Sequence, residues 1–232
     1  MDIMEVIRQR HSVRQYRGDP IEPEIRTALE FCVEECNQES GLHIGIVYDD
    51  PSGFDSKLAH YGQFINVNNY IYLAGKKDQE IDELCGYYGE KIVLYAQELG
   101  LNTCWVGLTF QKKAVKKLIL PDERLVAVIA LGYGVTQGKE RKSKSISDVV
   151  VTQGEMPDWF RRGVEAALLA PTAMNQQKFR IGTKRGNPAI ETYGHGFFLE
   201  VDLGIVKYHF EAASGKKVLK SRGYEKVMNK DE

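Results

Sequence analysis

The sequence predicts an α+β protein, and three observations support this fold class. Apolar residues recur at helical spacing over residues 25–36 and 81–99. Residues 125–131 instead form a continuous apolar run, which suits a strand buried on both faces. A similar succession of helices and strands is expected before and after the polar stretch 136–144. We therefore predict one fused globular unit with two halves, residues 1–138 and a shorter 139–232.

The first half is predicted to alternate between helices and strands. Asp2 can cap a helix over residues 2–10, and Glu22-Pro23-Glu24 has the proline and acids that favour a first helical turn. The further expected elements are a helix ending before Gly41, strands at 44–48 and 69–74, a helix at 81–99 ended by Gly100, and a short basic helix ending at 118–121.

The second half is predicted to repeat this plan in a shorter form. We expect a helix over 158–170, a strand after Asn175, a strand at 197–201, a helix at 203–213 and a charged tail from Gly215 on the surface. Ala59-His60-Tyr61-Gly62 precedes a strand and a long helix, and Glu191-Thr192-Tyr193-Gly194 is expected to do the same. This faint echo favours an internal duplication.

Composition excludes several classes of function. The chain has 232 residues and a net charge of −1, whereas a general nucleic-acid binder would carry a basic excess. It contains no run of 18 apolar residues and no basic segment followed by an apolar one at its start, so we expect a cytoplasmic protein without a membrane partner. The histidines show neither metal-ligand nor triad spacing, and the four cysteines suit a core.

The chemically most informative stretch is Arg10-His11-Ser12-Val13-Arg14-Gln15-Tyr16, directly after the first expected helix. Two guanidinium groups and a hydroxyl close together can bind a phosphate, because the planar arginine fork donates paired charge-assisted hydrogen bonds. The alternative is that Ser12 caps a turn and both arginines are solvated.

This stretch resembles the opening motif of the nitroreductase family, whose members hold FMN at a subunit interface. Gly100-Leu101-Asn102-Thr103-Cys104-Trp105-Val106-Gly107, the strand from Val126 to Tyr133, and Ala170-Pro171-Thr172-Ala173-Met174-Asn175-Gln176-Gln177 resemble three later family segments. The resemblance implies a nitroreductase-like fold with a central, mostly antiparallel or mixed sheet flanked by helices. One departure is that the Ala-Pro motif lies early in the family and near residue 170 here.

The resemblance also implies a chemistry and a set of site residues. Hydride would pass from NAD(P)H through FMN to a small-molecule electron acceptor such as a nitroaromatic or a quinone, and no side chain need act as an acid or base. The implied FMN-binding residues are Arg10, His11, Ser12, Arg14, Val106, Gly107, Leu108, Lys142, Lys144, Pro171, Thr172, Ala173 and Asn175. For Lys142 and Lys144 the alternative is a solvated linker, and for Pro171 it is a simple helix stop.

The displaced motif suggests a fused pseudo-dimer resembling the Thermotoga-type members of the family. In the family, the two lips of the flavin site come from different subunits, whereas this chain carries the arginine motif only in its first half and the Ala-Pro motif only in its second. We therefore expect one complete site per chain, and a monomer or a weak homodimer of pseudo-dimeric chains. The alternatives are a flavin-binding relative without turnover, or a domain that binds a protein partner through its charged tail.

Overall fold

The computed structural model describes residues 1–77, 80–152 and 155–219, which form a four-stranded sheet and a separate two-stranded hairpin. The larger sheet is antiparallel throughout, in the order β1-β2-β4-β3. Its strands are β1 (His43–Val47), β2 (Asn69–Lys76), β3 (Asn102–Val106) and β4 (Glu123–Gly132). The hairpin pairs β5 (Phe179–Lys184) with β6 (Asn187–Thr192).

Strand β4 is buried on both faces, as its continuous apolar run predicts. Ile129 and Leu131 pack into the main core, while Val128 and Ala130 pack into a second core on the opposite face. Side chains that alternate along a strand point to opposite faces, so this strand separates the two cores.

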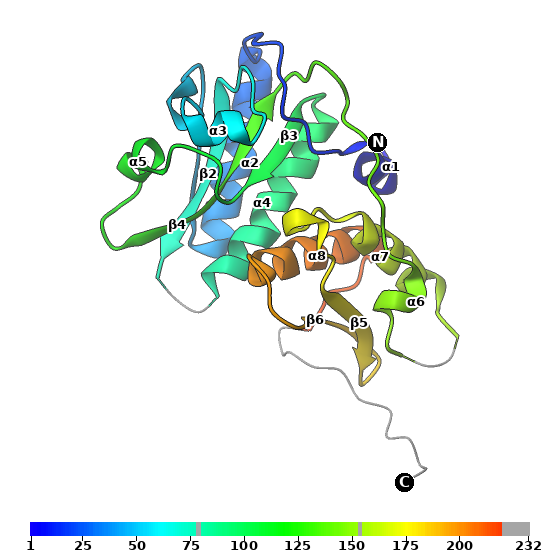
Figure 1. Ribbon diagram of the computed structural model, residues 1–232. Helices are drawn as coiled ribbons and strands as arrows, with labels where there is room; N and C mark the ends of the chain where they lie inside the picture. Colours follow the sequence, from blue (N-terminus) through cyan, green and yellow to red (C-terminus); the bar gives the residue numbers. More distant parts are fainter. Residues whose placement is uncertain (78–79, 153–154, 220–232) are drawn as a thin grey trace.

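Helices cover the main core and extend away from the sheet (Figure 1). The α-helices are α1 (Ile3–Gln9), α2 (Pro23–Ser40), α3 (Lys57–Tyr61), α4 (Ile81–Glu98), α5 (Lys112–Val115), α6 (Ile146–Val149), α7 (Asp158–Leu169) and α8 (Leu199–Ser214). Short 3₁₀ helices span Pro51–Gly53, Lys116–Leu118 and Ala173–Asn175. Within the described ranges, no helix is long and apolar enough to cross a membrane.

Helices α4 and α8 lie against each other with their backbones in contact. A Cβ added to Gly86 would lie 2.1 Å from the carbonyl oxygen of Val201, and one added to Gly204 would lie 2.0 Å from that of Glu83. Both positions therefore need glycine, because the backbones of the two helices touch there. Helix α7 packs against α8. Figure 1 shows both helices and the β5–β6 hairpin below the four-stranded sheet.

The expected strand at residues 197–201 is wrong. Phe198 has a φ of 59° and precedes α8, which begins at Leu199 and is buried on most sides. A helix that is buried on all sides has no single apolar stripe. The apolar residues of its first turn therefore resemble those of a buried strand. The echo drawn from Glu191-Thr192-Tyr193-Gly194 fails with it, because a helix alone follows that segment.

Two strands were absent from the expected elements. Strand β3 lies within a segment considered only for its family resemblance, and β6 contains Pro188, which lacks a backbone N–H and argues against a strand. Residues 220–232 of the expected surface tail lie outside the described residues.

Candidate functional site

The arginine motif lies in an extended segment held against the sheet. The backbone N–H of Val13 donates to the Thr103 carbonyl of β3 at 3.0 Å. Val13 and Tyr16 are buried beneath the segment, and the Tyr16 hydroxyl donates to the Val13 carbonyl at 2.8 Å. Alternation along extended chain then directs Ser12 and Arg14 away from this core, where both side chains are exposed.

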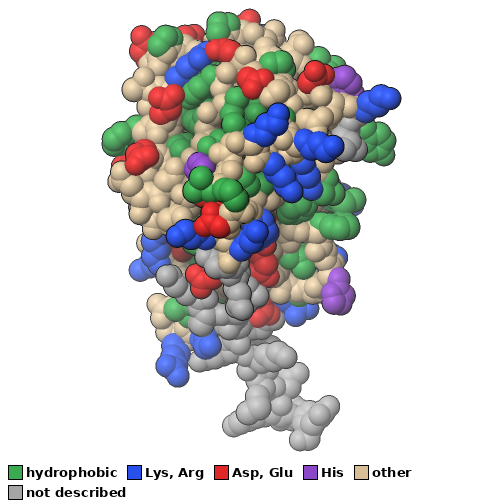
Figure 2. Space-filling view, turned by 90° about the vertical axis from the view of Figure 1, so that its left-hand side faces the viewer, with side chains coloured by type: hydrophobic (Ala, Val, Ile, Leu, Met, Phe, Trp, Pro, Cys, Tyr) green, Lys and Arg blue, Asp and Glu red, His purple; other side chains and the backbone are tan. Residues whose placement is uncertain are grey.

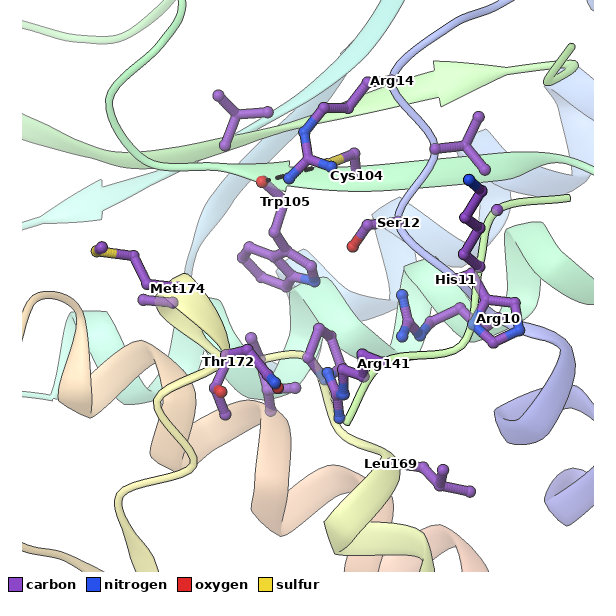
Figure 3. Close-up of a pocket in the computed structure, with 18 of the residues that line it drawn as sticks. Arg10, His11, Ser12, Arg14, Cys104, Trp105, Arg141, Leu169, Thr172 and Met174 are labelled. Atoms are coloured by element: carbon purple, nitrogen blue, oxygen red, sulfur yellow. Dashed lines mark hydrogen bonds between the residues drawn. The ribbon is translucent and has the colours of Figure 1, made fainter. Parts of the chain in front are cut away.

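The segment forms one wall of a cavity of about 1050 Å³. Arg10, His11, Ser12 and Arg14 line it from the first half, together with Val106 and Gly107 at the end of β3. The opposing residues from the second half include Pro171, Thr172, Ala173 and Asn175. Figure 3 shows the labelled side chains of both walls around the same space.

One end of this cavity concentrates positive charge. Arg10 is only 5% exposed, and its Nε atom has no hydrogen-bond partner among the described residues. Burial and, to a smaller extent, the neighbouring Arg10 lower the pKa of Arg141 to about 10. Burial and Arg10 also lower the pKa of His11. Arg10 and Arg141 are therefore two cations held in a poorly solvated place, which an anion would stabilise.

Arg10 is held from behind by a buried carboxylate. The Glu90 side chain is fully buried, lies 3.9 Å from the Arg10 Nε, and accepts a hydrogen bond from the Trp105 indole at 2.7 Å. His209 Nε2 is 2.8 Å from Glu90, and its Nδ1 is 3.0 Å from the Ala166 carbonyl. Since α4 carries Glu90 and α8 carries His209, both halves of the chain fix the place of Arg10.

Arg141 joins the polar bridge to the second half. Its Nη2 donates to the carbonyls of Leu168 and Ala170, at 3.1 and 2.6 Å, at the end of α7. A cation is favourable there because the last carbonyls of a helix carry partial negative charge and lack partners within the helix. The Ala-Pro segment therefore begins directly beside a fixed guanidinium group.

Asp202, near the start of α8, holds the loop of the second wall. Its carboxylate accepts from the backbone N–H of Ala173 at 2.9 Å and from the Gln176 side chain at 2.7 Å. Burial raises the pKa of Asp202 to about 6, although these two hydrogen bonds oppose the shift. The loop needs this support because Met174 and Asn175 both have a positive φ, which costs free energy for residues other than glycine.

Three of the sequence-predicted site residues do not line the cavity. Leu108 is 53% exposed outside it. Lys142 contributes a carbonyl that accepts from Asn175 at 2.8 Å, and the Lys144 ammonium donates to the Gln177 carbonyl at 2.7 Å and to Tyr193 at 2.9 Å. Lys144 therefore ties the bridge to the second half. The cations of the bridge that line the cavity are Lys139 and Arg141, of which Figure 3 labels Arg141.

Sequence reasoning missed Arg141, Asp202 and Glu90. Arg141 is adjacent to the predicted Lys142. The sequence showed that this stretch is basic, but not which of its side chains faces the cavity. Nothing in the sequence separates Asp202 or Glu90 from ordinary helix-surface acids. Within the described part of the chain, no group of three or more His, Cys, Asp or Glu residues could hold a metal ion.

Comparison with protein-family models decides the family. Residues 2–214 match the model described as "Putative TM nitroreductase". The chain belongs to this nitroreductase family. A comparison with curated proteins gave no match.

Solved structures agree with this membership. A structure described as a "putative nitroreductase" from Thermotoga maritima is 25% identical and has a TM-score of 0.69, with 96% of this chain and 90% of that chain covered. A Desulfovibrio desulfuricans structure, described as a nitroreductase in complex with FMN, is 16% identical with a TM-score of 0.54 and covers 68% and 99% of the two chains. The latter likeness concerns the fold alone.

Proposed function

We propose that this chain is an FMN-dependent oxidoreductase that passes hydride from NAD(P)H to a small acceptor such as a nitroaromatic or a quinone. The observation that carries the proposal is the pair of poorly solvated arginines, Arg10 and Arg141, at one end of the cavity beside His11. A phosphate would offset the charge of these two poorly solvated arginines, of which Arg10 also lacks a hydrogen-bond partner at its Nε atom. Family membership and the fold shared with an FMN-complexed protein support the same cofactor.

Each wall of the cavity has a distinct role in this proposal. Arg10 and Arg141 would bind the FMN phosphate, with the Ser12 hydroxyl as a short neutral donor. Arg14 lies apart from both arginines in Figure 3 and would place positive charge near the pyrimidine edge of the ring system. There it would stabilise the anionic reduced form. Bound FMN would supply the hydride chemistry.

The second wall would position the cofactor and leave room for the reactants. Pro171, Thr172 and Ala173 would close over it, and Asp202 fixes their backbone through Ala173. Asn175 has already committed one amide N–H to the Lys142 carbonyl, so its side-chain oxygen stays available as an acceptor. Met174 is 90% exposed at the rim and lines the cavity, which gives an arriving aromatic acceptor an apolar contact.

We also infer that the chain is a fused pseudo-dimer with halves 1–138 and 139–232. The α4–α8 contact supports this, because Gly86 meets α8 at Val201 while Gly204 meets α4 at Glu83. Gly86 and Gly204 are 118 positions apart (204 minus 86), as are Glu83 and Val201 (201 minus 83). A contact that repeats with its partners exchanged is the mark of two-fold symmetry.

The test of the flavin site is reconstitution with excess FMN, desalting, and an absorbance spectrum followed by an NAD(P)H oxidation assay. The wild-type protein should retain FMN and oxidise NAD(P)H with a quinone or nitroaromatic acceptor. The double variant Arg10→Ala with Arg14→Ala should lose FMN and keep its far-ultraviolet circular dichroism spectrum. Arg17→Ala, which removes an exposed arginine paired with Asp19 from the same segment, should retain FMN.

Two results would contradict this proposal in different ways. Retained FMN without any turnover would favour the flavin-binding alternative over an enzyme. Unchanged FMN affinity in a folded double variant would show that the arginine motif does not bind the cofactor.

A further inference from the structure

A second cavity of about 630 Å³ adjoins the proposed flavin site. The two cavities share Gly107 and Phe198 in their walls. These residues touch, because a Cβ added to Gly107 would lie 2.4 Å from the Phe198 ring. Gly107 and Phe198 therefore form the rim between the two cavities, and a single extended ligand that lies over this rim would reach both.

The wall of the second cavity, which we call the lysine pocket, is strongly basic. Lys77, Lys112, Lys116 and Arg124 line it, and Glu123 is its only lining acid among the described residues. Figure 2 faces the side of the molecule on which α5 lies, and Lys and Arg side chains gather there. A chain with a net charge of −1 therefore concentrates positive charge beside its candidate site.

Most of this charge is available to a ligand. The Glu123 carboxylate accepts from the Leu120 backbone N–H at 2.7 Å and contacts His43 Nδ1 at 2.7 Å, and Arg124 pairs with Asp82 at 2.8 Å. The ammonium groups of Lys77, Lys112 and Lys116 form no hydrogen bond or ion pair with any described residue, and all three side chains are exposed. Three free ammonium groups around one hollow would repel one another less with an anion between them.

The floor of the lysine pocket is apolar. Phe110 is 2% exposed and Val126 is 6% exposed, and the further apolar lining residues are Ile119, Leu120, Pro121, Leu125 and Phe198. An apolar floor beneath flexible cations suits a ligand that combines a flat ring with phosphates, and an adenine nucleotide has both parts.

We propose that the lysine pocket binds the phosphate-bearing adenosine end of the pyridine-nucleotide reductant and makes the enzyme prefer NADPH to NADH. The proposal rests on the proposed function, because it assumes that the nicotinamide ring lies in the neighbouring cavity. The extra 2′-phosphate of NADPH adds negative charge at the end of the dinucleotide that would reach the lysines. Electrostatic attraction would therefore favour NADPH, most strongly at low salt.

The test uses nucleotides that lack nicotinamide, so that it does not depend on turnover. Binding of 2′-phospho-ADP-ribose and of ADP-ribose to the full chain is measured by isothermal titration calorimetry at low and high salt. The FMN content of each sample is read separately by absorbance. We expect tighter binding of the 2′-phosphorylated compound, and a loss of this advantage at high salt.

The chain offers a closely matched pair of variants. Lys112→Ala with Lys116→Ala removes two cations from the pocket, and Lys113→Ala with Lys117→Ala removes two exposed cations from the same segment that do not line it. We expect about a tenfold loss of affinity for 2′-phospho-ADP-ribose in the first variant and less than about twofold in the second. In an active enzyme, the kcat/KM for NADPH should fall with it and that for NADH should change little.

Several outcomes would overturn the lysine pocket. Equal losses in the two variants would mean that general surface charge attracts the nucleotide, and equal affinity of the wild-type protein for both compounds would remove the NADPH preference. Binding that persists in a chain unable to retain FMN would instead support the pocket while contradicting the proposed flavin chemistry, so the two failures are distinguishable.

Discussion

At the scale of single residues, the guanidinium group of Arg141 makes two kinds of contact. It donates to the carbonyls at the end of α7 and also faces the cavity beside Arg10. The hydrogen bonds to the carbonyls fix the position of Arg141. Its place beside Arg10 is poorly solvated, and burial lowers its pKa to about 10. A bound phosphate should therefore gain a charged hydrogen bond at little entropic cost.

We expect Arg141→Ala to weaken FMN binding by about tenfold or more, which corresponds to a charged hydrogen bond of about 1.5–3 kcal/mol. Lys142→Ala is the matched control, since its side chain does not line the cavity, and it should change the affinity less than about twofold. Quenching of FMN fluorescence on titration measures both. If both substitutions weaken FMN binding equally, Lys142 contributes to phosphate binding as the sequence predicted.

The neighbouring positions 141 and 142 mark the limit of sequence reasoning about the site. The motif at residues 10–14 was readable because the family resemblance fixes its spacing, and the structure places Arg10, His11, Ser12 and Arg14 in the cavity wall. The bridge at residues 136–144 contains no helix or strand, so no periodicity indicates which of its side chains face the cavity. Its composition indicated only that a basic residue of the bridge contacts the site. Glu90 matters because α4 packs against α8, and Asp202 matters because α8 packs against the loop at residues 173–176. No local pattern records either of these distant contacts.

Asp202 should give this chain a measurable pH dependence. Burial raises its pKa from an ordinary value of 3.8 to about 6. The folded state therefore binds the proton more tightly than the unfolded state does. Its contribution to stability is fully present below pH 3.8 and is lost as the pH rises through 6, by about 3 kcal/mol at most.

Asp202→Asn should make the free energy of unfolding change less between pH 4 and pH 7, since a neutral amide has no ionisation cost, although its NH2 group cannot accept one of the two hydrogen bonds. Urea unfolding of both proteins across this pH range measures the difference. A variant that is less stable at pH 8 would show that the hydrogen bonds to Ala173 and Gln176 outweigh the desolvation of the carboxylate.

At the scale of elements, the α4–α8 contact joins the two halves and depends on two glycines. A methyl group at Gly86 or Gly204 would overlap backbone atoms of the opposite helix, which cannot move aside as a flexible side chain can. Gly86→Ala and Gly204→Ala should each cost about 3 kcal/mol or more, measured by chemical unfolding.

Gly186, in the turn between β5 and β6, separates this steric effect from backbone preference. It has a φ of 75° and no atom within 4 Å of an added Cβ, so Gly186→Ala should cost only about 1 kcal/mol. If all three substitutions cost the same, the close approach of the two helices would not be the reason for glycine.

The elements that the sequence predicted well are those with a clear periodicity. The helix expected at 81–99 lies at Ile81–Glu98, and the strand expected at 125–131 lies within Glu123–Gly132. The failures have a common physical cause, which is that tertiary packing overrides the local pattern. Helix α8 is buried on most sides, and the hairpin tolerates Pro188 in β6 because its strands belong to no wider sheet.

At the scale of the whole molecule, the two halves are unequal in what they bring to the cavity. The first half contributes the arginine motif and the end of β3, and the second contributes the Ala-Pro loop and Asp202. A second site of the same kind would need an arginine motif from the second half and an Ala-Pro loop from the first half. The sequence contains Arg-x-Ser-x-Arg once, at Arg10 to Arg14, and Ala-Pro once, at Ala170-Pro171.

We therefore expect each 26.3 kDa chain to bind one FMN. Titration at a protein concentration far above the dissociation constant should give an equivalence point at one flavin per chain, because each bound flavin then consumes one site. Light scattering on the same samples gives the mass of the assembly, and the ratio per chain should be one whether the chains are single or paired. At a free FMN concentration of 100 times the dissociation constant, binding should stabilise the folded chain by about 2.7 kcal/mol. An equivalence point at two would mean that the reverse pair of walls also binds flavin, through residues other than an arginine motif.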